Sequence, residues 1–251
     1  MVAKPSLDGL RVLITRPQQQ AKDLCEMVED AGGIAIPFPV INIKPIATQN
    51  WSNIALAEQD MIIFVSRNAV TFFIAGIEGD LPVNIQLVAV GAATATSMSE
   101  HGLRVDIQPP EPAGSESLLA MPALNNVKDK KVLIVRGQGG RELLADTLTT
   151  RGAKISYIEI YQRSLSTPSN AQIEQAKTAD CILVTSIAGL DNLSKLIDGD
   201  SLKSKKLIVV SERIRQYAIQ DSFQNIVVAD DASDVALIHK LNRMEQNDGK
   251  S

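Results

Sequence analysis

Arg11-Val-Leu-Ile-Thr-Arg16 decides the fold, because Lys131-Val-Leu-Ile-Val-Arg136 repeats it 120 residues further along the chain. The same shift continues without a gap and aligns further pairs of residues: Leu24 with Leu144, Gly32 with Gly152, Asp60 with Asp180, Ser66 with Ser186, and Val90 with Val210. A single register kept over such a length indicates an internal duplication. We therefore predict two similar halves that face a shared cleft.

A strand followed by a helix begins each repeat. Apolar runs at 12–15 and 132–135 precede stretches with helical spacing at 18–31 and 140–151. Further apolar runs predict strands at 34–38, 61–65, 87–90, 155–160, 181–184, 207–210 and 226–228. Because continuously apolar strands alternate with helices, the sequence predicts an α/β protein with parallel sheets buried on both faces.

Two extended segments, 39–44 and 159–164, are equivalent under the shift and predict connector strands. The repeat alone favours sequential domains, 1–125 and 126–251, but a discontinuous arrangement stays open.

Composition narrows the class of protein. The chain has 251 residues, 45% of them apolar, which suits one large domain or two small ones. A net charge of -4 argues against nucleic-acid binding, because phosphate backbones are bound by surplus Lys and Arg. No apolar run reaches the roughly 18 residues that span a bilayer, and the first six residues lack an apolar targeting core. We expect a cytoplasmic protein without membrane attachment.

The sequence offers little conventional catalytic machinery. Its His, Cys, Asp and Glu residues lack metal-site spacing, and Cys25 and Cys181 are predicted to be reduced core residues. His101 and His239 are predicted to be solvated. The glycine-rich segment 136–140 lacks the endings of nucleotide-binding loops, which leaves a generic anion contact or a flexible turn. We expect chemistry without a metal or cofactor, or no chemistry.

Small, hydroxylic or cationic residues follow the predicted strands. They are Thr15-Arg16, Ser66-Arg67-Asn68, Gly91 to Thr94, Arg136-Gly137 with the glycines after them, Thr185-Ser186, and Ser211-Glu212-Arg213. In open parallel sheets, ligands bind beyond the carboxyl ends of the strands, where helix N-termini present free N–H groups. These residue types are suited to binding carboxylates or phosphates. The alternative is that the serines and threonines only cap helices.

Tyr161 breaks the repeat, because Ile41 stands at the equivalent position. A hydroxyl in a connector strand could project into the cleft and act there. The alternative is a boundary tyrosine with its ring in the core and its hydroxyl bonded to the backbone.

An ordered set of segments resembles the uroporphyrinogen-III synthase family over essentially the whole chain. The segments are Val12 to Pro17, Phe64 to Val70, Val90 to Ala95, Ile160 to Arg163, and Val184 to Gly189. The resemblance implies a monomeric, cofactor-free enzyme that cyclises hydroxymethylbilane to uroporphyrinogen III, with inversion of the last ring through a spiro intermediate and loss of water. It also implies a possible transient hand-over of the substrate from hydroxymethylbilane synthase.

The resemblance implies a discontinuous layout of two flavodoxin-like domains around a cleft. Domain 1 would contain 1–38 and 165–251, and domain 2 would contain 45–158. A two-stranded β connector, 39–44 and 159–164, would join them.

Residue by residue, Tyr161 matches the tyrosine that the family is proposed to use for departure of the hydroxyl group. The predicted substrate-binding residues are Arg16, Ser66, Arg67, Thr94, Arg136, Gly137, Thr185, Ser186 and Arg213. Of these, Ser66, Thr94 and Ser186 match cleft-lining loops of the family. The chain departs from the family pattern at 211–215, where Ile214 replaces a threonine and Arg213 is the candidate substitute.

Two other classes of protein compete with this hypothesis. A non-enzymatic, two-lobed ligand-binding protein would share the α/β halves and the hinge. A sugar-nucleotide transferase would need acidic residues in the cleft, whereas Asp60 and Asp180 precede their strands.

Overall fold

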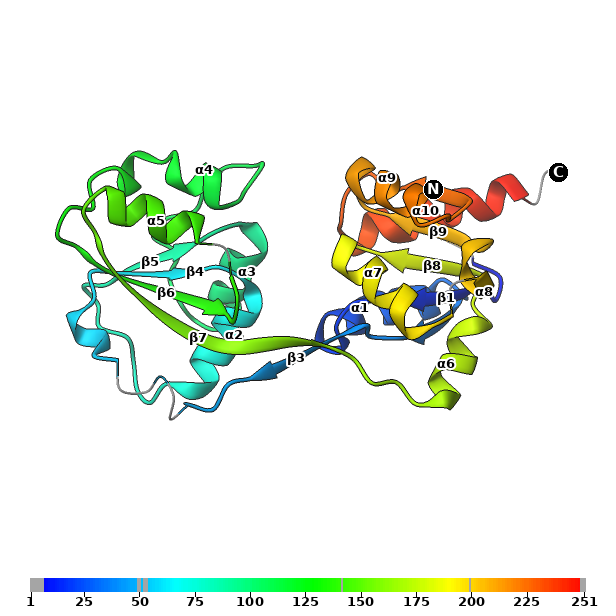
Figure 1. Cartoon of the computed structure of the whole chain (residues 1–251), viewed down its shortest axis with the longest axis horizontal. Helices are drawn as coiled ribbons and strands as arrows, with labels where there is room; N and C mark the ends of the chain where they lie inside the picture. Colours follow the sequence, from blue (N-terminus) through cyan, green and yellow to red (C-terminus); the bar gives the residue numbers. More distant parts are fainter. Residues whose placement is uncertain (1–6, 49–50, 52–53, 141, 199, 249–251) are drawn as a thin grey trace. The chain divides into compact units, whose positions relative to one another are not determined.

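The computed structural model describes residues 7–48, 51, 54–140, 142–198 and 200–248 (Figure 1). The chain forms two compact units. Unit 1 contains Met1–Asn42 and Ser164–Ser251, and unit 2 contains Ile43–Arg163. The chain therefore crosses between the units after Asn42 and again after Arg163, so sequential domains divided at residue 125 are not what forms.

Unit 1 is built on a five-stranded sheet with the order β10-β9-β8-β1-β2. Its strands are β1 (Arg11–Ile14), β2 (Ile34–Pro37), β8 (Cys181–Val184), β9 (Lys206–Val209) and β10 (Asn225–Val228). Its helices are α1 (Gln18–Asp30), α6 (Asn170–Lys177), α7 (Ile187–Leu196), α8 (Asp200–Lys203), α9 (Glu212–Gln220) and α10 (Asp234–Asp248). All strand pairs are parallel, and the order is that of flavodoxin-like sheets.

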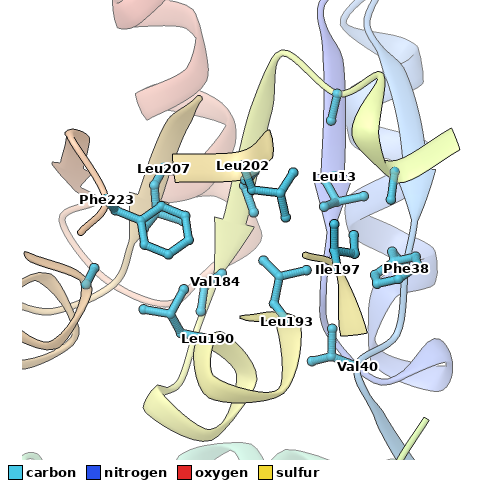
Figure 2. Packing of buried hydrophobic residues seen from close by; sticks show 14 of the residues in the cluster. Leu13, Phe38, Val40, Val184, Leu190, Leu193, Ile197, Leu202, Leu207 and Phe223 are labelled. Carbon is cyan, nitrogen blue, oxygen red and sulfur yellow. The ribbon is translucent and has the colours of Figure 1, made fainter. Parts of the chain in front are cut away.

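Alternate residues of these strands face two separate cores. Leu13 belongs to the core on one face together with Leu190 and Leu193 of α7, all labelled in Figure 2. Val12 packs on the opposite face with apolar residues of α1 and α10, among them Leu24. Both faces of the sheet are thus covered by helices, which explains why its strands are continuously apolar.

Unit 2 contains a second five-stranded sheet, with the order β3-β7-β6-β4-β5. Its strands are β3 (Ile41–Pro45), β4 (Met61–Phe64), β5 (Gln86–Ala89), β6 (Lys131–Gly137) and β7 (Lys154–Leu165). Its helices are α2 (Arg67–Gly76), α3 (Ala92–Glu100), α4 (Ser115–Leu119) and α5 (Leu143–Thr150), with short 3-10 helices η2 (Leu56–Glu58) and η3 (Pro122–Leu124). In Figure 1, α4 and α5 lie on one side of this sheet and α2 on the other, in agreement with the two cores.

The β3 strand is the exception to the parallel arrangement. The Ile46 N–H donates to the carbonyl of Ile160 at 2.9 Å, and the Ser166 N–H donates to the carbonyl of Val40 at 3.3 Å. Since one sequence number rises while the other falls, β3 runs antiparallel to the second half of β7. The two predicted connector segments are therefore paired strands.

The repeat is preserved in the strand registers of the two sheets. Arg11 pairs with Ile34 in unit 1, and Lys131 pairs with Lys154 in unit 2, both displaced by 120. The same displacement relates the β8–β9 register to the β4–β5 register. It even relates the β9–β10 pairing of Ile208 with Val227 to an isolated parallel bridge between Val88 and Ile107.

Each unit combines complementary parts of the two repeats. Unit 1 takes β1, α1 and β2 from the first repeat and β8 to β10 from the second. Unit 2 takes β4 and β5 from the first repeat and β6, α5 and β7 from the second. The folded units therefore exchange parts of the two repeats, and the boundaries of the repeats differ from those of the units.

The α/β prediction with two largely parallel sheets is confirmed, and the predicted strands agree with the observed ones to within a few residues. Within the described ranges, no helix is both long and apolar enough to cross a bilayer. The first six residues, which bear on targeting, lie outside the described part of the chain.

Candidate functional site

Each sheet has a switch point at the edge where its parallel strands end. In unit 2 the chain leaves β4 towards β5 and leaves β6 towards β7, on opposite sides. Val65 and Ser66 come immediately after β4, and Gly137 is the last residue of β6, so Ser66 and Gly137 both lie beside this switch point. In unit 1, Thr15 and Thr185 follow β1 and β8 at the equivalent place. Open α/β sheets bind ligands at such points.

Tyr161 lies on β7 beside the end of β6, within unit 2. An irregular register after Arg136 pairs Gly137 with Tyr161. The Tyr161 side chain is only 2% exposed and belongs to the core cluster of unit 2. Its ring centroid lies 6.0 Å from that of Phe72 on α2. The buried ring agrees with the boundary interpretation of this tyrosine.

Gly137 leaves the space that the Tyr161 ring fills. A Cβ atom at residue 137 would lie 2.4 Å from Cε2, 2.5 Å from Cζ and 2.9 Å from the hydroxyl oxygen of Tyr161. Carbon atoms do not approach one another so closely, so glycine at this position is what allows the ring to lie against β6.

The hydroxyl group of Tyr161 contacts two side chains, whereas the boundary interpretation predicted a backbone partner. Its oxygen lies 3.1 Å from the Ser66 Oγ, and the Arg163 Nη2 donates to it at 3.0 Å. The Ser66 side chain also caps α2 by accepting a hydrogen bond from the Ala69 N–H at 3.2 Å. Ser66 therefore caps α2 and also contacts Tyr161.

Arg136 is held by internal partners. Its Nη1 lies 2.8 Å from Glu142 Oε1, its Nη2 lies 3.2 Å from Glu159 Oε1, and its guanidinium carbon is 4.0 Å from the ring centroid of Tyr157. Burial alone would lower the pKa of Arg136, but the hydrogen bonds and charges of Glu142, Glu159 and Tyr157 together outweigh burial and raise it. The structure thus places Arg136 at the carboxyl edge of the sheet with two carboxylates already bound.

Tyr157 completes this cluster. Its hydroxyl donates to Glu142 Oε2 at 2.6 Å. Burial, followed by the hydrogen bond and negative charge of Glu142, raises the pKa of Tyr157 to about 12. The same hydrogen bond, together with Arg136, lowers the pKa of Glu142. A cavity of about 450 Å³ adjoins the cluster and is lined by Ile46, Trp51, Arg136, Gln138, Tyr157 and Glu159.

The corresponding residues of unit 1 are mainly helix caps and an ion pair. Ser186 caps α7 by accepting a hydrogen bond from the Gly189 N–H at 2.9 Å, as Ser66 caps α2. Arg16 forms an ion pair with Asp234 and donates to the carbonyl of Ala232 at 2.7 Å. Thr185, beside Ser186, is half-buried.

The remaining predicted site residues differ in their exposure. Arg67 begins α2 and is exposed, whereas Thr94 is buried in the first turn of α3. Arg213 lies exposed in the first turn of α9. Ile214, which stands where the family has threonine, is buried in the core of unit 1. The departure from the family pattern thus replaces a polar group with a core side chain.

The sequence model described as "Uroporphyrinogen-III synthase HemD" matches residues 22–239, which is most of the chain. The uroporphyrinogen-III synthase of Escherichia coli K12 is 33% identical over 248 residues, covering 92% of this chain and all of the relative. The enzyme of Salmonella typhimurium is 34% identical over 247 residues, with the same coverage.

This chain belongs to the uroporphyrinogen-III synthase family. Solved structures agree at the level of the fold. The synthase of Helicobacter pylori gives a TM-score of 0.66 at 14% identity, covering 94% of this chain and 99% of that one. A mutant synthase of Thermus thermophilus gives a TM-score of 0.62 at 18% identity, covering 95% and 100%. The α/β sheet architecture described above is therefore that of known uroporphyrinogen-III synthases.

Arg163 adjoins the candidate site and was not among the residues predicted for it. It contacts the hydroxyl of Tyr161 from two positions further along β7. Residues separated by two in a strand lie on the same face, and this spacing could have identified Arg163 once Tyr161 was singled out. The register irregularity that places Gly137 against Tyr161 has no comparable signature in the sequence.

Proposed function

We propose that this chain closes hydroxymethylbilane into uroporphyrinogen III, with inversion of the last pyrrole ring through a spiro intermediate and loss of water. The observation that carries the proposal is its family membership over nearly the full length, at 33% identity to the Escherichia coli enzyme. The product class, a cyclised tetrapyrrole, makes the enzyme a lyase of porphyrin and heme biosynthesis.

The reaction mainly requires that the enzyme position its substrate. Loss of the hydroxymethyl oxygen leaves a reactive azafulvene, which cyclises without help to the isomer in which no ring is inverted. The enzyme must hold the chain so that attack occurs at the substituted carbon of the last ring. Well-oriented reactants can gain several kcal/mol or more from such positioning.

The carboxylates of the substrate suit the polar residues at the strand ends. Ser66, Arg67, Thr94 and Gly137 of unit 2 are proposed substrate contacts. Thr185, Ser186 and Arg213 are the proposed contacts in unit 1. Helix N-termini at α2 and α7 support this, because their first N–H groups favour anions.

Arg16 and Arg136 have a different proposed role. Each guanidinium already contacts carboxylates of its own unit: Asp234 for Arg16, and Glu142 with Glu159 for Arg136. A second anion would have to compete with these partners. We therefore assign both arginines to holding the loops at the strand ends in place.

Tyr161 is the proposed general acid. Its proton would pass to the departing hydroxyl oxygen as the C–O bond breaks, so that water leaves and a phenolate remains. Closure of the macrocycle releases a proton from the attacked ring, which restores the phenol. Its position at the switch point, with its hydroxyl bonded to the side chains of Ser66 and Arg163, supports this assignment.

The deciding experiment incubates the purified chain with enzymatically generated hydroxymethylbilane and separates the uroporphyrin isomers after oxidation. We expect the type III isomer in excess. Formation of the type I isomer alone, as in the absence of enzyme, would refute the proposal. Binding of the tetrapyrrole with type I product only would instead favour a non-enzymatic ligand-binding protein.

Three finer points belong to the same proposal. The enzyme would act as a monomer in the cytoplasm and receive its reactive substrate by transient hand-over from hydroxymethylbilane synthase. Its domains would be 1–38 with 165–251, and 45–158, joined by strands 39–44 and 159–164. The chain crossings after Asn42 and Arg163 support these boundaries, because both fall within the proposed connector strands.

A further inference from the structure

Arg163 contacts Tyr161 in two ways, through a hydrogen bond to its hydroxyl and through the proximity of its guanidinium to the ring. Its Nη2 donates to the phenol oxygen at 3.0 Å, and its guanidinium carbon lies 5.4 Å from the ring centroid. Both residues belong to β7 and to unit 2, and their spacing of two places them on one face of the strand. The contact is therefore built into one rigid element.

The surroundings of the phenol oxygen determine where its proton can go. Arg163 has no acceptor atom, so its contact uses a lone pair of Tyr161 and leaves the phenol hydrogen free for donation. Ser66 lies 3.1 Å away and either donates to the phenol oxygen or accepts its hydrogen. When Ser66 donates, the phenol hydrogen is left for a third group.

We propose that Arg163 is a positioning residue for proton donation by Tyr161, an inference that rests on the proposed function. Its hydrogen bond directs the phenol hydrogen towards the departing hydroxyl oxygen of the substrate. Its positive charge lies beside the oxygen on which negative charge develops as the proton leaves. Pre-oriented donors at such an oxygen contribute strongly to rates because they need no reorganisation during the reaction.

The repeat supports a functional origin of the Tyr161–Arg163 pair. The equivalent residues in the first repeat are Ile41 and Ile43, whereas Ser66 has the equivalent Ser186. The serine caps a helix in both units, so it serves the fold in both. The tyrosine and arginine therefore occur together in one repeat only, as expected for groups that act together on one end of an asymmetric substrate.

The test compares Arg163→Met, Arg163→Gln and Arg163→Lys with the unaltered chain. Methionine keeps the apolar stem, glutamine keeps a neutral donor, and lysine keeps the charge. We expect Arg163→Met to lower kcat by roughly 10²-fold, the low end for one donor at a developing charge, with KM within about twofold. Arg163→Lys should recover most of kcat and Arg163→Gln less. Gln162→Met, exposed and on the opposite face of β7, is the matched control and should keep native kcat.

A double-mutant cycle with Tyr161→Phe separates positioning from a structural role. If Arg163 acts through the phenol, Arg163→Met should change kcat little once Tyr161 is phenylalanine. An equal loss in both backgrounds, or native kcat for Arg163→Met alone, would overturn the proposal. Failure of the proposed function looks different, because the unaltered chain would then yield only the type I isomer.

Discussion

At the scale of single residues, the Tyr161 hydroxyl is the group on which the proposed chemistry depends. Tyr161→Phe removes this hydroxyl and keeps the buried ring. We expect kcat to fall by about 10²- to 10⁴-fold, the usual contribution of a positioned general acid, with the type III isomer still predominant in what product forms. Steady-state rates and isomer analysis measure both quantities.

Tyr157→Phe provides the matched control for that substitution. Tyr157 lies on the same strand, but its hydroxyl donates to Glu142. We expect its removal to leave kcat within about threefold of native, since the group lies outside the proposed proton path. Native kcat for Tyr161→Phe would remove Tyr161 from the mechanism.

Gly137 has a steric role at the same site. A Cβ atom introduced by Gly137→Ala would lie 2.4 Å from the Tyr161 ring, so the ring or the β6 backbone must move. Displacement of a catalytic group by about 1 Å can cost roughly 10²-fold in rate, and overpacking typically costs 1–3 kcal/mol of stability. Kinetics and denaturant unfolding test this together. A native rate would show that the ring position does not matter, and in the Tyr161→Phe background the rate should change little.

Residue-level prediction from the sequence was limited by contacts that depend on register. Tyr161 was proposed because it breaks the repeat and matches the family. Its neighbours were not, because Gly137 meets Tyr161 only through an irregularity in the β6–β7 pairing. Residue type likewise did not predict the partners of Arg16 and Arg136, which contact carboxylates of their own units.

At the scale of secondary-structure elements, the cluster around Tyr157 ties the end of β6 to β7 and to the start of α5. The pKa of Tyr157 is about 12, against 10.0 for the free side chain, so the stability that this group contributes depends on pH. The unfolded chain loses the phenol proton first, so the stability from this group is complete below pH 10 and declines as the pH rises towards 12.

Tyr157→Phe should therefore flatten the loss of stability between pH 10 and 12. The measurement is the denaturant midpoint as a function of pH for both chains. Equal slopes in this window would show that Tyr157 titrates alike in the folded and unfolded states.

Asp60 and Asp180 accept hydrogen bonds from strand backbone at the amino ends of the sheets. Asp180 Oδ2 accepts from the Arg11 N–H at 2.9 Å, and Asp60 Oδ2 accepts from the Lys131 N–H at 2.8 Å. Their position before the strands was predicted, and the structure shows a structural role repeated in both units. We expect Asp60→Ala and Asp180→Ala each to cost about 1 kcal/mol, because a hydrogen bond to the strand is lost.

The two effects should add in the double variant, because the aspartates lie in different units. Asp60→Asn and Asp180→Asn retain an acceptor oxygen and should cost less. Denaturant unfolding of the four single variants and the Ala/Ala double variant tests this. A clearly non-additive double variant would mean that the units unfold as one coupled body.

Element boundaries were predictable because the strands are buried on both faces and so are continuously apolar. The separate strands expected at 155–160 and 159–164 proved to be one strand, β7. The sequence is mixed in polarity there, and the change of pairing partner from β6 to β3 along the strand has no signature in the sequence. Pairing partners, rather than local propensity, set the length of β7.

At the scale of the whole molecule, the duplication and the folded units divide the chain differently. Sequential and exchanged halves both agree with the repeat, because a strand of one repeat can take the place of the equivalent strand of the other repeat. The sequence therefore predicted the repeat but could not by itself choose between sequential and exchanged halves. The choice depends on which copy of β1 pairs with β8, and in the structure Val12 pairs with Cys181.

Two fragments of the same length distinguish the two arrangements. Fragment 41–165 contains all five strands of the unit 2 sheet, whereas fragment 1–125 contains β1 and β2 of one sheet with β3, β4 and β5 of the other. In fragment 1–125, β1 lacks β8 and β4 lacks β6, so two sheets are left with buried edges unpaired.

We expect fragment 41–165 to unfold cooperatively on heating, with dispersed amide resonances in solution, and fragment 1–125 to be unfolded or aggregated. Neither should form the type III isomer, because 41–165 lacks the predicted contacts Thr185 and Ser186, and 1–125 lacks these and Tyr161. Cooperative unfolding of 1–125 would contradict the exchanged arrangement. An unfolded 41–165 would mean that unit 2 needs unit 1 for stability, although its two cores are formed within residues 43–163.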